Sequence, residues 1–402
     1  MNSSNFSRRQ FLRNTTLGGL AVGLGGTSLL SACSSSSSSG AGAGGSIKIG
    51  ALTDLTGAFG VVGKANKAVA EFTVDEINAA GGVLGRQLEL TVVDSATDPT
   101  VGAQVAKRLV ESTKVDMLIG GVATNMREAI RSTIATRSKT LYIWPAPYEG
   151  GECTPNVWSV GAVPNQQVDP IVKKLLADGA KTFFLCGNDY AYPRKILARV
   201  RDQVEAGGAK VVAEEYIPLT TTDPSALVNK VISANADALF EIVVLPATAP
   251  FIQGVVGGGY KGKIAGTLFD EAINQLLGPS AKGLLGAQDY FQSVEDPQST
   301  TIVKRFEAKY PGVPFSATYN SPDWYRGIHL WKAAVEKAGS TDLDKVNLAF
   351  DSASFADLVG GPAKMIPGTR HCALSMYLGE MQADGSVKIL ESPGQISPEG
   401  QC

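Results

Sequence analysis

Two tyrosines, an acid and an arginine stand close together in the segment "GNDYAYPR" (187–194). Tyrosine hydroxyls donate or accept hydrogen bonds and a carboxylate accepts them, so this set could hold a small polar molecule or assist proton transfer. The segment follows the apolar run 182–185, which is typical of a buried strand, and α/β proteins bind ligands beyond the carboxyl ends of such strands. We therefore predict that Tyr190 and Tyr192 face a binding site; the alternative is that Asp189 only caps the following helix.

A second tyrosine and acid follow another predicted strand. The apolar run "LYIWPA" (141–146) is followed by Pro147, Tyr148 and Glu149. Because parallel strands end at one edge of a sheet, we predict that Ala146, Tyr148 and Glu149 belong to the same site. The alternatives are core packing for Tyr148 and a hinge salt bridge for Glu149.

The sequence offers little for catalysis. The patterns G-x-S-x-G and H-E-x-x-H do not occur in it. A Ser-His-acid triad would need His329 or His371, the two histidines of the chain, and His329 lies in an apolar helical pattern that favours packing. We predict a protein that is not an enzyme and that needs no cofactor.

The cysteines favour disulfide chemistry over metal binding. Cys153, Cys186, Cys372 and Cys402 follow Cys33, none of them in C-x-x-C spacing, and two histidines are too few for a His/Cys metal cluster. Four cysteines allow three full connectivities. We expect a Cys153–Cys372 bridge, with Cys186 buried in its strand and Cys402 free.

The N-terminus reads as an export signal. Arg8 and Arg9 followed by Phe-Leu are typical of the twin-arginine route, and the apolar stretch 17–30 is too short to span a bilayer. It ends in Leu-Ser-Ala-Cys, which resembles a bacterial lipobox with Cys33 as the lipidated residue. We predict a signal peptide at 1–32 and a Ser/Gly-rich tether at 33–46. The alternative is an ordinary signal with a chance cysteine.

Charge and length exclude some classes of protein. Without the three arginines before Cys33, 33 basic residues remain of the 36, against 38 acidic residues, a net charge of −5. A nucleic-acid partner is therefore not expected. No run of 18 apolar residues occurs, and residues 33–402 exceed what one hydrophobic core fills, so we expect two lobes without a membrane span.

Strand-like and helix-like stretches alternate in two successive blocks. The first extends from about 47 to 146, and the second from about 170 to 250. Continuous apolar strands separated by amphipathic helices predict two doubly wound α/β lobes. The stretch 373–390 alternates apolar and polar residues around Asp384-Gly385, which predicts a β-hairpin.

Several segments resemble a known family. "IKIGALTDLTGAFGVVGK" (47–64) and "DEINAAGGVLGRQLEL" (75–90) are similar to type I periplasmic binding proteins, the branched-chain amino-acid-binding family of ABC transporters. "PYEGGECTPNVWSVGAVPNQQ" (147–167) and "GNDYAYPRK" (187–195) resemble its amide- and urea-binding branch. The resemblance covers about 47–390.

The resemblance implies two α/β lobes joined by a three-segment hinge, with ligand between them. The crossings would fall near 160–165, 288–293 and 345–355. The implied domains are lobe 1 at 47–162 and 293–348 and lobe 2 at 163–292 and 349–395.

The resemblance also implies further site residues. The loop "GVATN" (121–125) resembles the family's ligand loop, with Ala123 and the Thr124 hydroxyl at a helix start; the alternative for Thr124 is a helix cap. Asp270 in "TLFDEA" (267–272) occupies the place where amino-acid binders hold the ligand's ammonium; the alternative is an acid at a helix N-terminus.

We therefore expect a monomeric, lipid-anchored solute-binding protein on a periplasmic or extracellular membrane face. It would capture a small amide or urea-like solute by hinge closure and deliver it to an ABC permease. The alternatives are a branched-chain or other amino-acid-binding protein, a secreted amide hydrolase and a two-lobed sensor.

Overall fold

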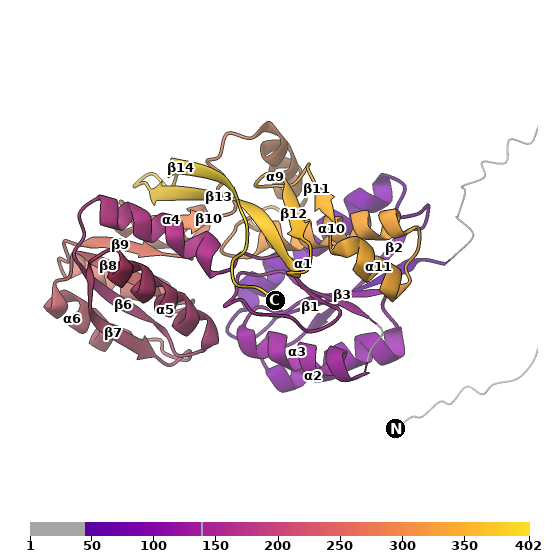
Figure 1. Cartoon of the computed structure of the whole chain (residues 1–402), viewed down its shortest axis with the longest axis horizontal. Coiled ribbons are helices and arrows are strands. Elements are labelled where there is room, and N and C mark those ends of the chain that lie inside the picture. Colours follow the sequence, from indigo (N-terminus) through magenta and orange to yellow (C-terminus); the bar gives the residue numbers. More distant parts are fainter. Residues whose placement is uncertain (1–44, 138–139) are drawn as a thin grey trace, which may run out of the picture. The chain divides into compact units, whose positions relative to one another are not determined.

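The computed structural model describes residues 45–137 and 140–402 (Figure 1). The predicted signal peptide, Cys33 and nearly all of the tether lie outside the described residues. Strands and helices alternate along the chain, as their apolar runs and amphipathic stretches predict. The elements up to residue 159 are β1 (Ile47–Thr53), α1 (Gly60–Ala79), β2 (Leu88–Asp94), α2 (Pro99–Arg108), η1 (Leu109–Thr113), β3 (Met117–Gly120), α3 (Thr124–Arg137), β4 (Leu141–Trp144) and β5 (Val157–Ser159).

The alternation continues through the second block. Its elements are α4 (Pro164–Ala177), β6 (Thr182–Asn188), α5 (Ala191–Ala206), β7 (Lys210–Ile217), α6 (Ser225–Ala234), β8 (Ala238–Ile242), α7 (Thr248–Gly257), β9 (Lys263–Gly266), α8 (Glu271–Leu277), η2 (Gly278–Ala281) and β10 (Leu285–Gln288). The last part contains α9 (Pro297–Lys309), α10 (Ser321–Ala338), α11 (Leu343–Phe350), β11 (Ser354–Phe355), β12 (Ala363–Ile366), β13 (His371–Met381) and β14 (Val387–Ile396).

Local signals explain several helix ends. The Asp98 side chain accepts hydrogen bonds from the N–H groups of Thr100 and Val101, and Pro99 occupies the first position of α2. Gly81 and Gly82 follow α1 with φ of 102° and 78°, values that residues with a Cβ rarely adopt. These signals make the helix ends readable from the sequence.

The strands form one curled sheet with two parallel halves. Its order is β2-β1-β3-β4-β5-β13-β10-β9-β8-β6-β7, and β13 is antiparallel to β10. We call β1–β5, α1–α3 and α9–α11 lobe 1, and β6–β10 with α4–α8 lobe 2. Each half is parallel, so all its strands end at the same edge. The structure thus confirms the two-lobed, doubly wound α/β fold.

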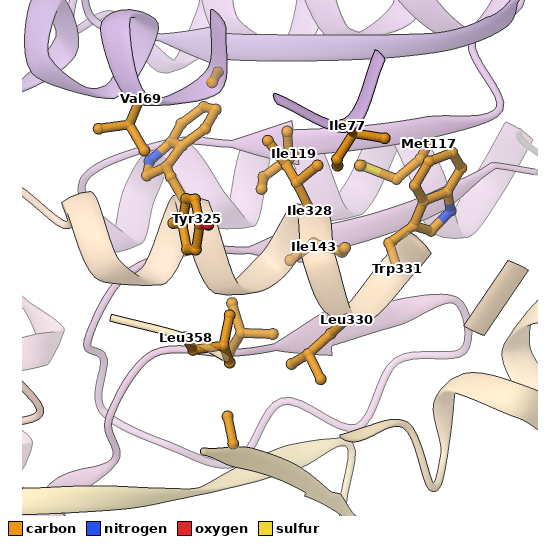
Figure 2. Packing of buried hydrophobic residues seen from close by; sticks show 14 of the residues in the cluster. Val69, Ile77, Met117, Ile119, Ile143, Tyr325, Ile328, Leu330, Trp331 and Leu358 are labelled. Atoms are coloured by element: carbon orange, nitrogen blue, oxygen red, sulfur yellow. The ribbon is translucent and has the colours of Figure 1, made fainter. Parts of the chain in front are cut away.

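Both faces of each half-sheet are covered by helices. In β3, Met117 and Ile119 pack on the side of α1 and α10, whereas Leu118 packs on the side of α2 and α3. Figure 2 shows Ile119 and Ile143 of the sheet against Ile328 of α10. Burial on both faces is why these strands read as continuous apolar runs.

The helix α10 is buried along most of its length, including His329. This imidazole lies 4.4 Å from the ring of Tyr325 and 4.7 Å from that of Phe355, centroid to centroid. Burial lowers the pKa of His329 to about 3, so the ring is neutral. The prediction that His329 is a packed residue is confirmed.

The expected third crossing near 345–355 is wrong. Ala353, Leu358 and Met365 belong to the core of lobe 1, together with α10. The chain instead crosses within β13, whose first residue pairs with β5 and whose last residues pair with β10. β14 runs back antiparallel to β13, which confirms the predicted hairpin (Figure 1).

The expected Cys153–Cys372 bridge is also wrong. Cys153 is bonded to Cys402, with the two Cα atoms 5.4 Å apart. Cys372 points into the core, where its Sγ contacts the Met365 sulfur at 3.2 Å, and Cys186 is buried and free as expected. The bridge holds the C-terminus of the chain against the loop that follows β4.

Candidate functional site

A cavity of about 710 Å³, its mouth included, lies between the lobes. Lobe 1 and the segment before α10 contribute Phe59, Val62, Val122, Ala123, Thr124, Trp144, Ala146, Pro147, Thr318 and Asn320. Lobe 2 contributes Tyr190, Tyr192, Val244, Leu245, Thr248, Leu268 and Ile273.

The sheet topology brings these residues together. Ala123, Ala146, Tyr190, Val244 and Leu268 each follow, within a few residues, the carboxyl end of a parallel strand. The two half-sheets present these ends to the same cavity, which is where α/β folds bind ligands. Five of the residues predicted for the site line it. They are Ala123, Thr124, Ala146, Tyr190 and Tyr192.

The two tyrosines of the 187–194 segment differ in their hydrogen bonding. The Tyr192 hydroxyl lies 2.8 Å from the Thr267 hydroxyl and donates to the Gln167 side chain at 3.1 Å. The Tyr190 hydroxyl makes no hydrogen bond to any described residue, so it is open to a ligand. Burial raises the pKa of both phenols, which keeps them neutral donors. Asp189 does not cap α5; it pairs with the Arg194 guanidinium at 2.7 Å.

Thr124 is joined to Glu149 behind the cavity wall. Its hydroxyl donates to Glu149 at 3.1 Å, and the other oxygen of Glu149 accepts from Arg127 at 2.8 Å. Glu149 does not line the cavity. It forms a salt bridge, as the alternative for this residue predicts, but its partner Arg127 belongs to α3. At the start of α3, the Met126 and Arg127 N–H groups donate to the Ala123 carbonyl, whereas the N–H groups of Thr124 and Asn125 have no acceptor among the described residues.

Tyr148 faces the hinge and does not line the cavity. Its ring stacks on His371, with centroids 5.5 Å apart, and its hydroxyl hydrogen-bonds to Nε2 of that ring. The Nδ1 atom of His371 faces the Thr369 carbonyl, which can only accept, so Nδ1 carries the proton and Nε2 accepts from Tyr148. The hydroxyl also accepts from the Glu152 N–H at 3.2 Å. Core packing, the alternative for Tyr148, describes its place better.

Acid should destabilise the fold through His371. Burial lowers its pKa from 6.5 to about 4, with Glu152 and Arg127 as the nearest charged groups. Above pH 6.5 the ring is neutral in both the folded and the unfolded protein. Between pH 6.5 and 4 only the unfolded chain binds a proton at this ring. Lowering the pH through this range therefore lowers the free energy of unfolding by up to ~3 kcal/mol. Urea unfolding at pH 7 and pH 4.5 measures this loss.

The control for this pH dependence is His371→Gln, which keeps an acceptor for Tyr148 but does not titrate. Its loss of stability between pH 7 and 4.5 should be smaller than that of the parent, and the remainder includes His329. An equal loss in parent and variant would contradict the assignment to His371.

Asp270 lies beside the cavity without lining it. Its side chain caps α8 by accepting from the N–H groups of Ala272 and Ile273, both at 3.1 Å. It also accepts from the Thr318 N–H at 2.9 Å and from the Ser316 hydroxyl. Both carboxylate oxygens therefore already have donors in this structure.

Most of the apolar lining, above all Trp144, was not predicted from the sequence. This residue ends β4, is 1% exposed, and its indole N–H has no hydrogen-bond partner among the described residues. Arg127 lies behind it, with Cζ 5.4 Å from the ring centroid. In the structure, its buried donor without an acceptor indicates a role in the site. In the sequence, Trp144 is only one residue of an apolar strand.

The lining is apolar with a few uncharged polar groups. Besides the indole of Trp144, its polar side chains are hydroxyls and one amide, at Thr124, Tyr190, Tyr192, Thr248, Thr318 and Asn320. Within residues 45–137 and 140–402, no three His, Cys, Asp or Glu side chains gather closely enough to bind a metal ion. Over the same residues, every helix is too short or too polar to cross a membrane.

The chain is similar to curated amino-acid-binding proteins. It is 25% identical over 322 residues to the leucine-, isoleucine-, valine-, threonine- and alanine-binding protein of Pseudomonas aeruginosa, covering 78% of this chain and 84% of that one. It is 26% identical over 318 residues to the Leu/Ile/Val-binding protein BraC3 of Rhizobium johnstonii, covering 74% and 80%.

Solved structures share the fold. A solute-binding protein of an ABC transporter from R. palustris, in complex with benzoate, has a TM-score of 0.78 at 22% identity over 89% of this chain and 99% of that one. The branched-chain amino-acid-binding protein LivJ of Streptococcus pneumoniae, in complex with isoleucine, has a TM-score of 0.76 at 21% identity over 88% and 100%. A family model described as periplasmic binding protein matches residues 46–386. The chain therefore belongs to the periplasmic binding protein family.

Proposed function

We propose that this protein captures a small solute in the cavity between its lobes and delivers it to an ABC permease. The observation that carries this proposal is that both lobes line one cavity, at the carboxyl ends of their strands. A solute that contacts both lobes stabilises the closed arrangement relative to the open one. The family supports an extracytoplasmic location, where a disulfide such as Cys153–Cys402 persists. Lipid anchoring at Cys33, twin-arginine export and a monomeric state remain part of the proposal.

For the ligand we infer an uncharged solute that carries an amide or a similar carbonyl group. The described lining residues include no charged side chain, and the two nearby acids, Glu149 and Asp270, already accept hydrogen bonds. An ion buried here would lack a partner, which is costly, whereas Tyr190 and the first turn of α3 can donate to a carbonyl oxygen. Because most of the side chains that line the cavity are apolar, an amide that carries a hydrocarbon group matches the lining better than urea does.

The second candidate is a branched-chain or other amino acid, which the relatives favour. The curated relatives bind leucine, isoleucine and valine, among other amino acids. The first turn of α3 could hold a carboxylate, because helix N-termini favour anions, and the Thr124 hydroxyl could join it by giving up its bond to Glu149. The ammonium would need Asp270, whose oxygens would first have to give up their present donors.

A hydrolase finds less support, because the relatives and the neighbouring structures are solute-binding proteins. A sensor would share the cavity and would differ only in its partner. Copurification with an ABC permease would favour transport, and copurification with a signalling protein instead would favour the sensor.

Thermal unfolding against a ligand panel tests the function. The panel holds urea, aliphatic and aromatic amides, benzoates, and branched-chain and polar amino acids. A ligand at 100 times its Kd adds about 2.7 kcal/mol of stability, visible as a rise in Tm. A rise with amides supports the first candidate, and a rise with amino acids alone supports the second. Absence of any rise, or steady release of product from an amide, would refute the proposal.

Tyr190→Phe should raise the Kd for the ligand about tenfold, because it removes a hydroxyl that has no other partner among the described residues. Tyr148→Phe is the matched control, since its hydroxyl bonds to His371 outside the cavity. Isothermal titration measures both Kd values. An equal Kd for Tyr190→Phe and the parent would remove Tyr190 from the site.

A further inference from the structure

Asp270 joins two parts of the chain that belong to different lobes. One oxygen, Oδ1, caps its own helix α8 in lobe 2. The other, Oδ2, accepts from the Thr318 N–H at 2.9 Å and from the Ser316 hydroxyl. The two oxygens of one carboxylate thus have separate tasks.

Ser316 and Thr318 belong to lobe 1. The segment that carries them is fixed by Phe315, whose ring lies 5.3 Å from that of Phe306 and 6.5 Å from that of Tyr325 in the core of lobe 1. Asp270 is fixed on the other side, because Phe269 before it and Ile273 after it pack in the core of lobe 2. The bonds at Oδ2 therefore span the two lobes.

A third hydrogen bond strengthens this connection. The Thr318 hydroxyl donates to the Leu268 carbonyl at 2.9 Å, and Thr318 and Leu268 both line the cavity. Around them, Phe59, Val62 and Ala123 of lobe 1 form one apolar cluster with Val244 and Ala272 of lobe 2. The connection lies at the wall of the ligand cavity and is shielded from water, since Asp270 is 1% exposed.

We propose that Asp270, with Ser316 and Thr318, is a latch that holds the lobes closed over the solute without touching it. This inference rests on the proposed function. Hydrogen bonds to a carboxylate are stronger than neutral ones, and these form only when the lobes meet. Separation of the lobes returns Oδ2 to water but leaves the cap of α8 intact. Asp270 is thus a positioning residue, and its effect on affinity is the same for every ligand class.

Asp270→Asn separates the two tasks of the carboxylate. The amide oxygen can still cap α8, whereas the amide NH₂ would face the Thr318 N–H, donor against donor. We expect the Kd of every bound ligand to rise about tenfold to a hundredfold, mainly through faster dissociation. The Tm of the ligand-free variant should stay close to that of the parent. Ser316→Ala should act in the same direction, and the two changes together should cost less than their sum.

Asp98→Asn is the matched control. Asp98 caps α2 through Thr100 and Val101 and has no bond to lobe 2, so its Kd should equal that of the parent. Stopped-flow dissociation and titration with the ligands of the panel give both quantities. A parent that binds no ligand refutes the proposed function and the latch with it. A parent that binds, with an Asp270→Asn variant of equal Kd, refutes the latch alone, as does a rise in Kd confined to ligands that carry an ammonium group.

Discussion

Replacing Arg326 by methionine should lower the free energy of unfolding by about 3–5 kcal/mol, because it leaves carboxylates buried without their cation. Arg326 is 2% exposed in α10. One of its nitrogens donates to Asp323 and to the Val160 carbonyl, each at 2.6 Å, and another pairs with Asp289. Urea unfolding of the parent and the variant measures the loss.

The position of these groups makes the effect large. Val160 and Asp289 lie in the first two segments that connect the lobes, so Arg326 ties both segments to lobe 1. Burial and the nearby Asp289 raise the pKa of Asp323 well above its usual range. Without the guanidinium, one carboxylate is expected to take up a proton. The loss of stability of Arg326→Met relative to the parent should therefore become smaller as the pH is lowered.

Arg194→Met is the control for a solvent-exposed pair. Arg194 and Asp189 are both about half exposed, so water screens the pair and its loss should cost far less stability than the loss of Arg326. Adding Asp289→Asn to Arg326→Met should restore part of the lost stability, since it removes one unpaired charge. An Arg326→Met variant as stable as Arg194→Met would contradict the assigned role.

The fold could be predicted because its signals are local. Phe183 and Phe184 face opposite sides of β6 and are both buried, so the strand reads as a continuous apolar run. Proline at the first position of α2 and paired glycines after α1 mark helix ends through backbone geometry alone. Such features depend only on residues that are close in sequence, so one amino-acid sequence is enough to predict them.

The site residues could be predicted only where they come directly after a strand, because the direction of the strand then places them. Tyr190 and Tyr192 follow β6 directly, so the strand aims them at the cavity. Tyr148 lies four residues beyond the end of β4, and the Tyr148 N–H donates to the Ala162 carbonyl, which directs the loop toward the hinge. That contact joins distant segments and leaves no trace in the spacing of residues. The Cys153–Cys402 pair, 249 residues apart, was unpredictable for the same reason.

Trp144 is the residue of the cavity for which we expect the largest effect on binding. Trp144→Ala should abolish ligand binding and cost about 3–5 kcal/mol of stability, because it empties the cavity wall and part of the core of lobe 1. Trp144→Phe is the sharper test, since it keeps a ring there and removes only the indole N–H. That N–H has no acceptor among the described residues, so its removal should leave the Tm of the ligand-free protein nearly unchanged.

In the complex, an acceptor of the ligand would satisfy this N–H, so Trp144→Phe should raise the Kd about tenfold. Trp158→Phe is the matched control, for which we expect the opposite result. The Trp158 indole N–H donates to Asn347 at 2.8 Å, outside the cavity. That variant should lose about 1 kcal/mol of stability and keep the parent Kd. Titration and thermal unfolding of the two variants separate the roles. A Kd for Trp144→Phe equal to that of the parent would show that the ligand leaves this donor unpaired, and the ligand would then be held chiefly by Tyr190, the first turn of α3 and the apolar wall.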